Sequence, residues 1–372
     1  MNLFKDYIYP VAVFSGGMIG VGFLSLPYIA MKSGIWVMLG YFLILTALVV
    51  AINLIFCEIS LKTPDFKRFP GFVGHYLGKW AKLLALTLTV LGTFGVLLVY
   101  LLVGSQFLQS IFQPVFLGNS LIYVLIYYLI ISTVTFFDSK VISKVEFSVV
   151  ILLFLSVLFI FLEGFPRINF SNIFISNFKF QISNLFLPYG PLLFALWGIG
   201  LIPEIEEMIV GKKQNLKKII TTSTILISVF YLFFVLLIIG ITGNSTSQTA
   251  LDGLKNFVGR GVALVSLLIG LLATTTAFVA QAIIFKKTLM FDLKIKHWHA
   301  FVITCFTPLI LFLIGLKSLI FLLSLTGGVF LGIDGVLILL MYKKIGGKNI
   351  IIYPLSAVFL LGVVYEIIYF IK

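Results

Sequence analysis

The chain has 372 residues, of which 61% are hydrophobic and only 10% are charged. Soluble domains carry about 25% charged residues, so this composition excludes a large soluble protein and indicates an integral membrane protein. The net charge is +13, but the basic residues gather in loops between apolar runs, which favours membrane topology over a nucleic-acid partner. These runs are too long for the strands of a barrel, so we expect an all-α integral membrane protein.

Eleven apolar runs are long enough to cross a bilayer as helices. They cover about residues 8–30, 35–56, 83–111, 121–137, 142–163, 189–210, 218–243, 259–286, 298–316, 318–342 and 350–371. Most of the 26 Lys and Arg residues lie in connections on the same side of the membrane as the N-terminus. This bias predicts a multi-pass protein of the cell (inner or plasma) membrane, surrounded by lipid, with its N-terminus cytoplasmic and its C-terminus extracytoplasmic.

Two connections between these runs are long. Residues 60–81 mix basic and aromatic residues, which predicts an amphipathic helix on the membrane surface with Trp80 as an interfacial anchor. Residues 164–188 are rich in Asn, Ser and Phe, and we expect them to form a folded cap over the outer mouth.

Glycine interrupts two of the apolar runs. The middle of the first run holds Ser15, Gly16, Gly17, Gly20 and Gly22, and the sixth run holds Gly198, Gly200 and Pro203. Glycine and proline weaken a helix, so both runs are expected to unwind near the middle of the membrane. The alternative is that the glycines allow close helix packing. Two interrupted spans at corresponding places in two halves indicate the binding site of a secondary transporter.

The positions of the interrupted spans predict the domain organisation. Runs one to five (residues 8–163) and runs six to ten (residues 189–342) each begin with an interrupted helix. Because five is odd, the second half must enter the membrane in the opposite orientation, which gives a 5+5 inverted repeat. The last run, at 350–371, is then an additional peripheral helix in a single transmembrane domain covering residues 1–372.

A broken helix exposes backbone groups that can bind a small ion or zwitterion. The N–H groups near Gly20, Val21 and Gly22 would point at an anion, and the carboxylate of an amino acid is the natural ligand. The carbonyl of Met18, just before the break, would accept from a substrate ammonium group or coordinate a cation. This arrangement requires no charged side chain.

Several stretches resemble a known group of transporters. SGGMIGVGFLSLPYIAMKSG (residues 15–34) resembles the first span of the amino acid–polyamine–organocation superfamily. SNLFLPYGPLLFALWGIGLIPEIEEMI (residues 183–209) resembles the sixth span of the amino acid/auxin permeases and of the hydroxy- and aromatic-amino-acid permeases, the tryptophan/tyrosine permease type. Residues 63–80, 99–108 and 271–283 support the match. The resemblance implies a leucine-transporter-like fold, with substrate between the two breaks and flanked by spans three and eight.

The resemblance also implies roles for individual residues. The glycine turn of the first span matches a carboxylate-binding turn, and Met18 matches a carbonyl that faces the substrate amine. Trp197 matches an aromatic side chain that covers the substrate, or it packs within the bundle. Gly198 and Gly200 lie in the matching unwound segment. Tyr100 on the third span closes the pocket through its hydroxyl, or it is an ordinary buried tyrosine.

The coupling ion, H⁺ or Na⁺, remains open at the level of sequence. Thr274, Thr275 and Thr276 stand where sodium-coupled relatives place hydroxyl ligands, and hard oxygen ligands suit a small cation. Alternatively, these hydroxyls bond to carbonyls of their own helix. Proton-coupled members of the superfamily can carry a Lys on the fifth span, but Leu153 stands at that position here.

Acidic residues offer a route for protons instead. Asp334 lies midway along the tenth span, where an ionisable group is a candidate functional residue. Glu204 follows the break of the sixth span and is a candidate gate or proton relay. Glu366 lies at a similar depth, but on the helix outside the repeat.

The remaining polar residues do not suggest enzymatic chemistry. Glu206 and Glu207 are expected at the surface beside Lys212 and Lys213. The three His residues fall in inner loops, and neither a nucleophile–base set nor a metal-ligand cluster is visible. We therefore expect a protein that is not an enzyme and that has no metal or cofactor.

Together these features predict an ion-coupled symporter that takes up neutral or aromatic amino acids by alternating access. Spans three and eight carry no charge in their middles, which argues for a neutral substrate. The alternative is an amino acid sensor on the same fold that binds but does not transport. Sensors usually have a long cytoplasmic tail, whereas the N-terminal tail here has about seven residues. A channel would require a pore helix or a ring of charges, and neither is visible.

Overall fold

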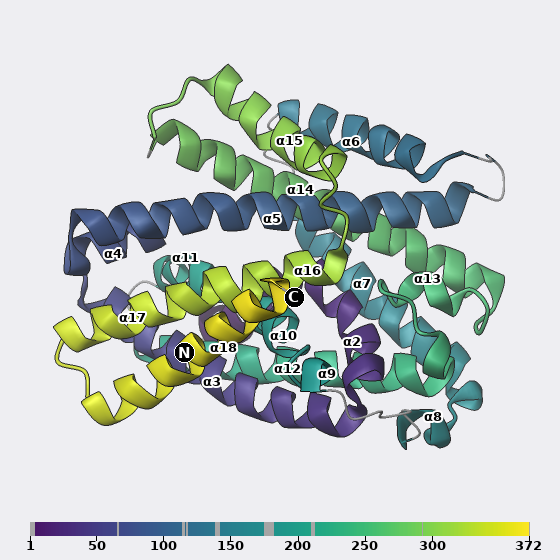
Figure 1. The fold of residues 1–372 in the computed structure, drawn as a ribbon, viewed down its shortest axis with the longest axis horizontal. Coiled ribbons are helices and arrows are strands. Elements are labelled where there is room, and N and C mark those ends of the chain that lie inside the picture. Colours follow the sequence, from purple (N-terminus) through teal and green to yellow (C-terminus); the bar gives the residue numbers. More distant parts are fainter. Residues whose placement is uncertain are drawn as a thin grey trace.

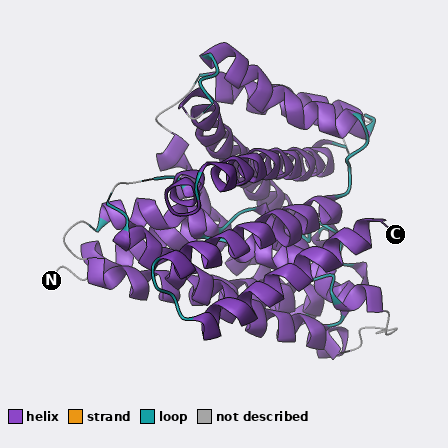
Figure 2. Cartoon of the chain, turned by 60° about the vertical axis from the view of Figure 1, so that its left-hand side comes forward, coloured by secondary structure: helices purple, strands orange, loops and turns teal. Residues whose placement is uncertain are grey.

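The structure is a computed structural model that describes residues 4–64, 67–113, 116, 118–137, 142–174, 182–209, 213–291 and 293–371. Within these residues the regular structure is entirely helical, as Figure 2 shows. Six of the described helices are long and apolar enough to cross a membrane, and the bent pair Phe4–Met18 and Val21–Ser33 makes a seventh span. The predicted all-α membrane class is confirmed.

Each predicted span coincides with a helix or with a broken helix. The first five correspond to α1 (Tyr9–Met18) with η2 (Val21–Ser25) and α2 (Leu26–Ser33), then α3 (Ile35–Lys62), α5 (Lys79–Phe112), α6 (Ser120–Phe136) and α7 (Ile142–Gly164). The next five correspond to α10 (Tyr189–Leu196) with α11 (Ile202–Met208), then α12 (Leu216–Thr242), α14 (Arg260–Phe291), α15 (His297–Leu313), and α16 (Leu319–Ser324) continued by η7 (Leu325–Leu331) and α17 (Gly332–Lys344). The last is α18 (Asn349–Ile371).

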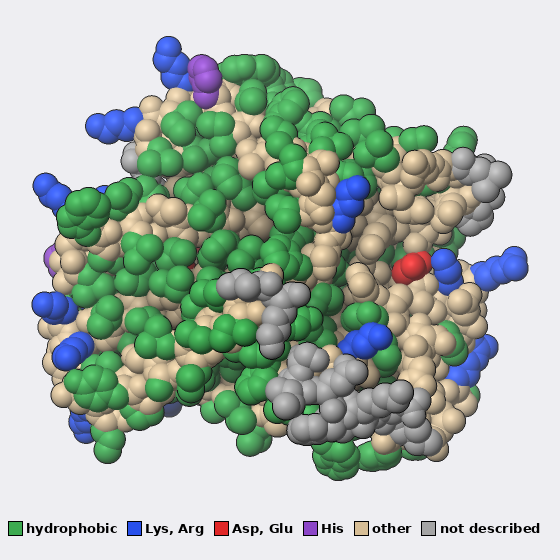
Figure 3. Space-filling model, viewed as in Figure 1, with side chains coloured by type: hydrophobic (Ala, Val, Ile, Leu, Met, Phe, Trp, Pro, Cys, Tyr) green, Lys and Arg blue, Asp and Glu red, His purple; other side chains and the backbone are tan. Residues whose placement is uncertain are grey.

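The longest helix, α5, runs across the whole molecule and divides the bundle (Figure 1). Helices α6 and α15 lie on one side of it, α3, α10, α12, α17 and α18 lie on the other, and α14 crosses behind it. Hydrophobic side chains cover much of the visible surface, and many Lys and Arg side chains gather at its left and right edges (Figure 3). This distribution is that of a bundle whose apolar girdle faces lipid.

A helix, α4 (Phe69–Leu77), lies in the connection predicted to form a surface helix, and it packs against α5. Gly78 turns the chain between them with φ of +90°, a conformation that suits glycine. The side chain of Trp80 is 86% exposed at the start of α5. That exposure fits the interfacial anchor expected from the sequence.

The predicted outer cap lies between α7 and α10. It contains a short 3₁₀ turn, η3 (Phe165–Arg167), and two short helices, α8 (Phe170–Phe174) and α9 (Ile182–Leu185). Residues 175–181 of this connection lie outside the described part of the chain. The boundaries of the two repeats, at 8–163 and 189–342, remain a prediction.

Candidate substrate-binding site

The first span is broken where the glycines predict. Helix α1 ends at Met18, Ile19 and Gly20 are extended, and a 3₁₀ turn begins at Val21. The two halves of the span are bent by 57°. Because Val21 starts a new turn, the first N–H groups of that turn have no preceding carbonyl within their own helix.

The sixth span is broken in the same way. Helix α10 ends at Leu196, Trp197 has an extended backbone (φ −73°, ψ 118°), and a 3₁₀ turn, η4 (Ile199–Leu201), leads into α11. Proline at the second position of α11 suits a helix start, where its missing N–H costs nothing. The interruption of both spans is therefore a property of the structure as well as of the sequence.

The two breaks lie against each other. A Cβ placed on Gly198 would be 2.9 Å from the ring of Phe14 and 3.3 Å from the sulfur of Met18. A Cβ on Gly22 would be 2.6 Å from the ring of Phe194 on α10. Such close approach requires glycine. The glycines therefore have both of the effects considered from the sequence: they interrupt the helices, and they allow the broken segments to pack closely.

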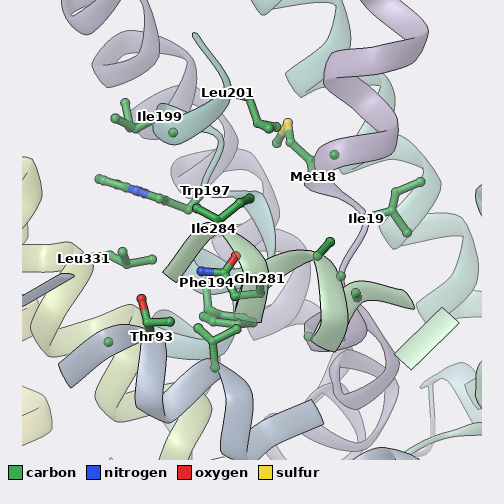
Figure 4. Close-up of a pocket in the computed structure, with 18 of the residues that line it drawn as sticks. Met18, Ile19, Thr93, Phe194, Trp197, Ile199, Leu201, Gln281, Ile284 and Leu331 are labelled. Carbon is green, nitrogen blue, oxygen red and sulfur yellow. The ribbon is translucent and has the colours of Figure 1, made fainter. Parts of the chain in front are cut away.

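A cavity of about 880 Å³ opens beside the two breaks (Figure 4). Its walls come from α1, the break of span one, α5, α10, the break of span six, α14 and the η7–α17 segment. Many of the side chains that face it are apolar or aromatic, including Phe194, Trp197, Ile284, Phe330 and Leu331. The cavity is large enough for a small organic ligand.

The cavity extends toward the end of the bundle where α1 begins. Tyr9 in the first turn of α1 and Glu204 on α11 line it, and both are exposed. At the other end η2 packs against α10, and Phe23 stacks on Tyr231 with ring centroids 5.2 Å apart. The structure is therefore open toward the side of the N-terminus and closed by aromatic packing beyond the breaks.

Most of the predicted substrate residues meet at this cavity. Its walls include six of them: Met18, Gly20, Gly22, Tyr100, Trp197 and Gly200. Val21 and Gly198 belong to the breaks, but neither is among the residues that line the cavity.

Tyr100 lies at the turn that the sequence assigns to substrate carboxylate. A Cβ on Gly20 would be 3.3 Å from its hydroxyl oxygen. The structure therefore places this hydroxyl beside the backbone of the break.

The carbonyl of Met18 has a partner that the sequence did not reveal. The hydroxyl of Tyr231, in the middle of α12, donates to this carbonyl at 3.0 Å. A carbonyl oxygen has two lone pairs, so one acceptor position remains for a substrate or a cation. Tyr231 is fully buried, and a lone Tyr in an apolar span was the only available signal for it.

Trp197 lines the cavity, and its ring also meets Phe359 of α18 edge to face, with centroids 6.4 Å apart. The sequence left open whether Trp197 covers a substrate or packs within the bundle. In the structure its ring borders the cavity and also packs against α18. Gln281 of α14 was not predicted, and its amide points into the cavity near Trp197 and Phe194 (Figure 4). Thr89 and Thr93, one helical turn apart on α5, also line the cavity and were also missed.

The threonines of span eight lie away from this cavity. Thr275 Oγ1 donates to the carbonyl of Leu271 at 2.7 Å, and Thr276 Oγ1 bonds to the carbonyl of Leu272 at 3.1 Å. Thr274 bonds in the same way to carbonyls of its own helix. None of the three is among the described residues that line the cavity, and the hydroxyls make the local bonds given above as the alternative.

Two of the acidic residues do line the cavity. Asp334 is 8% exposed on α17, and its Oδ1 has no hydrogen-bond partner. Glu204 lies at the exposed end, where Arg68 and Glu207 are close enough to interact with it electrostatically. Glu204 and Asp334 are the charged side chains among the described residues that line the cavity.

The expectation that Glu206 lies at the surface is wrong. Its side chain is 4% exposed, and the hydroxyl of Ser60 on α3 donates to its Oε2 at 2.6 Å. Helix α11 packs against α3, which turns this face of α11 inward. Glu207 is exposed as expected, while Lys212 and the side chain of Lys213 lie outside the described part.

Solved structures of three membrane transporters are similar to the whole bundle. MhsT in complex with L-phenylalanine has a TM-score of 0.65 at 14% identity, covering 100% of this chain and 98% of that one. Mhp1, a nucleobase-cation-symport-1 family transporter with bromovinylhydantoin bound, has a TM-score of 0.64 at 14% identity, covering 97% and 89%. A manganese transporter mutant of Eremococcus coleocola has a TM-score of 0.62 at 13% identity, covering 98% and 85%.

These similarities establish the fold, which is the leucine-transporter fold expected from the sequence. A comparison with curated proteins finds no match. The model of the family described as transmembrane amino acid transporter protein matches residues 7–339, and the chain belongs to this family.

Proposed function

We propose that the protein is a secondary active transporter that binds a neutral or aromatic amino acid between its two broken helices. The single observation that supports this most is the meeting of both breaks at one cavity. The free N–H groups from Gly20 to Gly22 would bind the substrate carboxylate. The second acceptor position on the Met18 carbonyl would receive the ammonium group.

The chemistry of the cavity supports an amino acid with an apolar side chain. Phe194, Trp197 and Phe330 provide aromatic walls. Among the described lining residues there is no Lys or Arg to pair with an acidic side chain. The Gln281 amide would contribute a hydrogen bond to the polar end of the substrate. L-phenylalanine, bound in the similar MhsT structure, is therefore the first substrate to test.

Transport would be coupled to an ion, and the position of Asp334 favours H⁺. A buried carboxyl oxygen without a hydrogen-bond partner, at the wall of the cavity, can exchange a proton with water that enters from the open side. Glu204 would relay that proton at the mouth. The sodium alternative would use Thr275 and Thr276, whose hydroxyls would have to leave their own helix carbonyls.

The cycle would be alternating access about the two breaks. The cavity is open toward the N-terminal side, which we assign to the cytoplasm from the distribution of Lys and Arg. Opening the other side would require separation of η2 from α10 and of Phe23 from Tyr231. Uptake across the cell membrane follows from this topology together with an inward ion gradient.

The experiment is uptake of radiolabelled amino acids into liposomes that contain the purified protein. We expect uptake of L-phenylalanine or another neutral amino acid under an imposed proton gradient, and no uptake into empty liposomes. Stimulation by a sodium gradient alone would assign the coupling to sodium. Absence of uptake of all twenty amino acids under either gradient would overturn the transporter proposal.

The second candidate function is a non-transporting amino acid sensor on the same fold. A sensor would bind a labelled amino acid in detergent and yet show no uptake in the same liposomes. The binding measurement and the uptake measurement together therefore separate the two proposals.

A further inference from the structure

A buried carboxyl group comes from the helix that the sequence places outside the two repeats. Glu366 on α18 is only 1% exposed. Its neighbours on the helix face outward: Val364 is 52% exposed and Ile367 is 44% exposed. Helix α18 therefore presents one acidic side chain to the interior of the bundle, on a surface that is otherwise apolar.

The backbones of α10 and η7 closely approach the Glu366 carboxyl group of α18. A Cβ on Gly190, at the start of α10, would lie 2.7 Å from Glu366 Oε1 and 2.7 Å from the backbone of Ser324. A Cβ on Gly328, in η7, would lie 2.9 Å from the same oxygen, and one on Gly327 would lie 1.9 Å from the carbonyl oxygen of Gly190. The Glu366 side chain thus fills the junction of α10, η7 and α18.

The polar groups at this junction are few. Oε1 of Glu366 has no hydrogen-bond partner, and it lies beside the first turn of α10, where a Cβ on Gly190 would be 2.7 Å from it. Gly190 is the second residue of α10, where an N–H has no acceptor within its own helix. The unpartnered carboxyl oxygen is therefore directed at the N-terminus of a half-helix of the broken sixth span.

The titratable side chains that interact with Glu366, in the part of the chain that the structure describes, are three tyrosines. Tyr189 comes from α10, Tyr41 from α3 and Tyr365 from α18 itself. The η7 segment, with sequence LTGGVFL, contributes no titratable side chain. The junction therefore offers the carboxyl group an amide and phenol groups, and not a basic side chain.

Two effects of opposite sign act on a proton at this position. Burial in an apolar interior disfavours the ionised carboxylate. The free N–H groups and the dipole at the start of α10 favour it. The second effect disappears within about one helical turn, so the affinity for a proton depends on where α10 lies.

We propose that Glu366 is a proton-binding site whose occupancy is linked to the position of α10. When α10 lies against the carboxyl group, as it does here, the N–H groups at its start make the carboxylate more favourable than it is without them. When α10 moves away, the carboxylate loses the favourable field of the N–H groups at the start of α10 and binds a proton more tightly. By linkage, protonation favours the arrangement in which α10 is displaced.

This linkage would reach the cavity because α10 is short. The helix runs from Tyr189, at the junction, to Leu196, directly before the break that carries Trp197. The first residue of α10 thus lies at the proton site, and its last residue lies at the proposed substrate site. The role in transport rests on the proposed function, whereas proton binding itself does not depend on it.

The test is a pH titration of the purified protein by infrared spectroscopy, without any substrate. We expect a protonated carboxylic acid band that titrates with pH, and we expect Glu366→Gln to lose the Glu366 part of it while the part due to other carboxyl groups, such as that of Asp334, remains. The control Glu58→Gln removes a partly exposed carboxylate that pairs with Lys62 at 2.9 Å, and it should leave the band unchanged. A titrating band that is the same in Glu366→Gln as in the unmodified protein would overturn the proton site.

A second variant tests the linkage to α10. Gly190→Ala would place a methyl group against both Glu366 and the Ser324 backbone, which forces α10 away from the carboxyl group. The midpoint of the Glu366 band should rise by about one pH unit, a tenfold gain in proton affinity. The control Gly40→Ala, where no atom lies within 4 Å, should not shift it.

An unshifted midpoint in Gly190→Ala would remove the link between the proton site and α10. Should Gly190→Ala fail to fold, Glu366→Asp makes the same test, because the shorter side chain retreats from the Gly190 amide. Its band should persist with a raised midpoint, and an unchanged or lowered midpoint would overturn the linkage. None of these results requires transport, so failure here is distinct from failure of the proposed function.

Discussion

The turn at Gly20 gives the most direct prediction about substrate binding. A Cβ at this position would lie 3.3 Å from the hydroxyl of Tyr100, at the wall of the cavity. Gly20→Ala forces Tyr100 to shift by a few tenths of an ångström. Overpacking of this kind costs about 1–3 kcal/mol, which corresponds to roughly 5- to 150-fold weaker binding if the cost falls on the bound state. Gly20→Leu adds three more carbons beside the proposed carboxylate site and should abolish binding.

The assay is equilibrium binding of labelled L-phenylalanine, or of the amino acid found by uptake, to protein purified in detergent. Size-exclusion chromatography and the melting temperature report whether the variants remain folded. Gly40→Leu is the matched control, since Gly40 has no neighbouring atom within 4 Å and is exposed on α3. Folded Gly20→Leu that retains the affinity of the unmodified protein would refute the role assigned to this turn.

Three further predictions follow from contacts at the cavity and in the bundle. Asp334→Asn should leave substrate binding in place but remove the dependence of uptake on the proton gradient, since the amide cannot exchange a proton. Tyr231→Phe deprives the buried Met18 carbonyl of its donor, a loss of about 1–3 kcal/mol, and should weaken substrate binding about tenfold. Gly104→Ala places a methyl group 2.1 Å from the ring of Tyr127 and should lower the melting temperature by several degrees, because α5 and α6 are forced apart.

Each of these substitutions has a control at a position away from the contact that it tests. Glu58→Gln should leave the proton dependence of uptake intact, and an equal loss in both variants would remove Asp334 from the coupling mechanism. Tyr353→Phe on α18 changes a 58% exposed ring and should not alter affinity. Gly261→Ala meets no atom within 4 Å. A melting temperature of Gly104→Ala equal to that of Gly261→Ala would contradict the packing argument.

The local features of this protein are readable from its sequence. The runs of apolar residues mark the spans because the bilayer core requires about twenty such residues per helix. The glycines at 16, 17, 20 and 22, and those at 198 and 200, mark the breaks because glycine weakens a helix wherever it stands. Both signals act over a few residues, and the structure has helices and breaks at those places.

The residues that complete the cavity are not readable in this way. Gln281, Thr93 and Tyr231 are uncharged polar residues in apolar spans, and their position depends on how α14, α5 and α12 are rotated. The same holds for Glu206, which packing against α3 turns inward to Ser60. Each side chain points to one side of its helix. Which part of the protein that side faces is set by the neighbouring helices.

The sequence by itself determined the class, the spans and the two broken helices, because these depend on short-range preferences and on the thickness of the membrane. Only the tertiary structure decided which polar groups meet. Spans three, eight and ten bring Tyr100, Gln281 and Asp334 to one cavity, and α18 carries Glu366 to the start of α10. Contacts between residues far apart in the chain arise from the packing of whole helices, and a pattern within one helix carries no information about its partner.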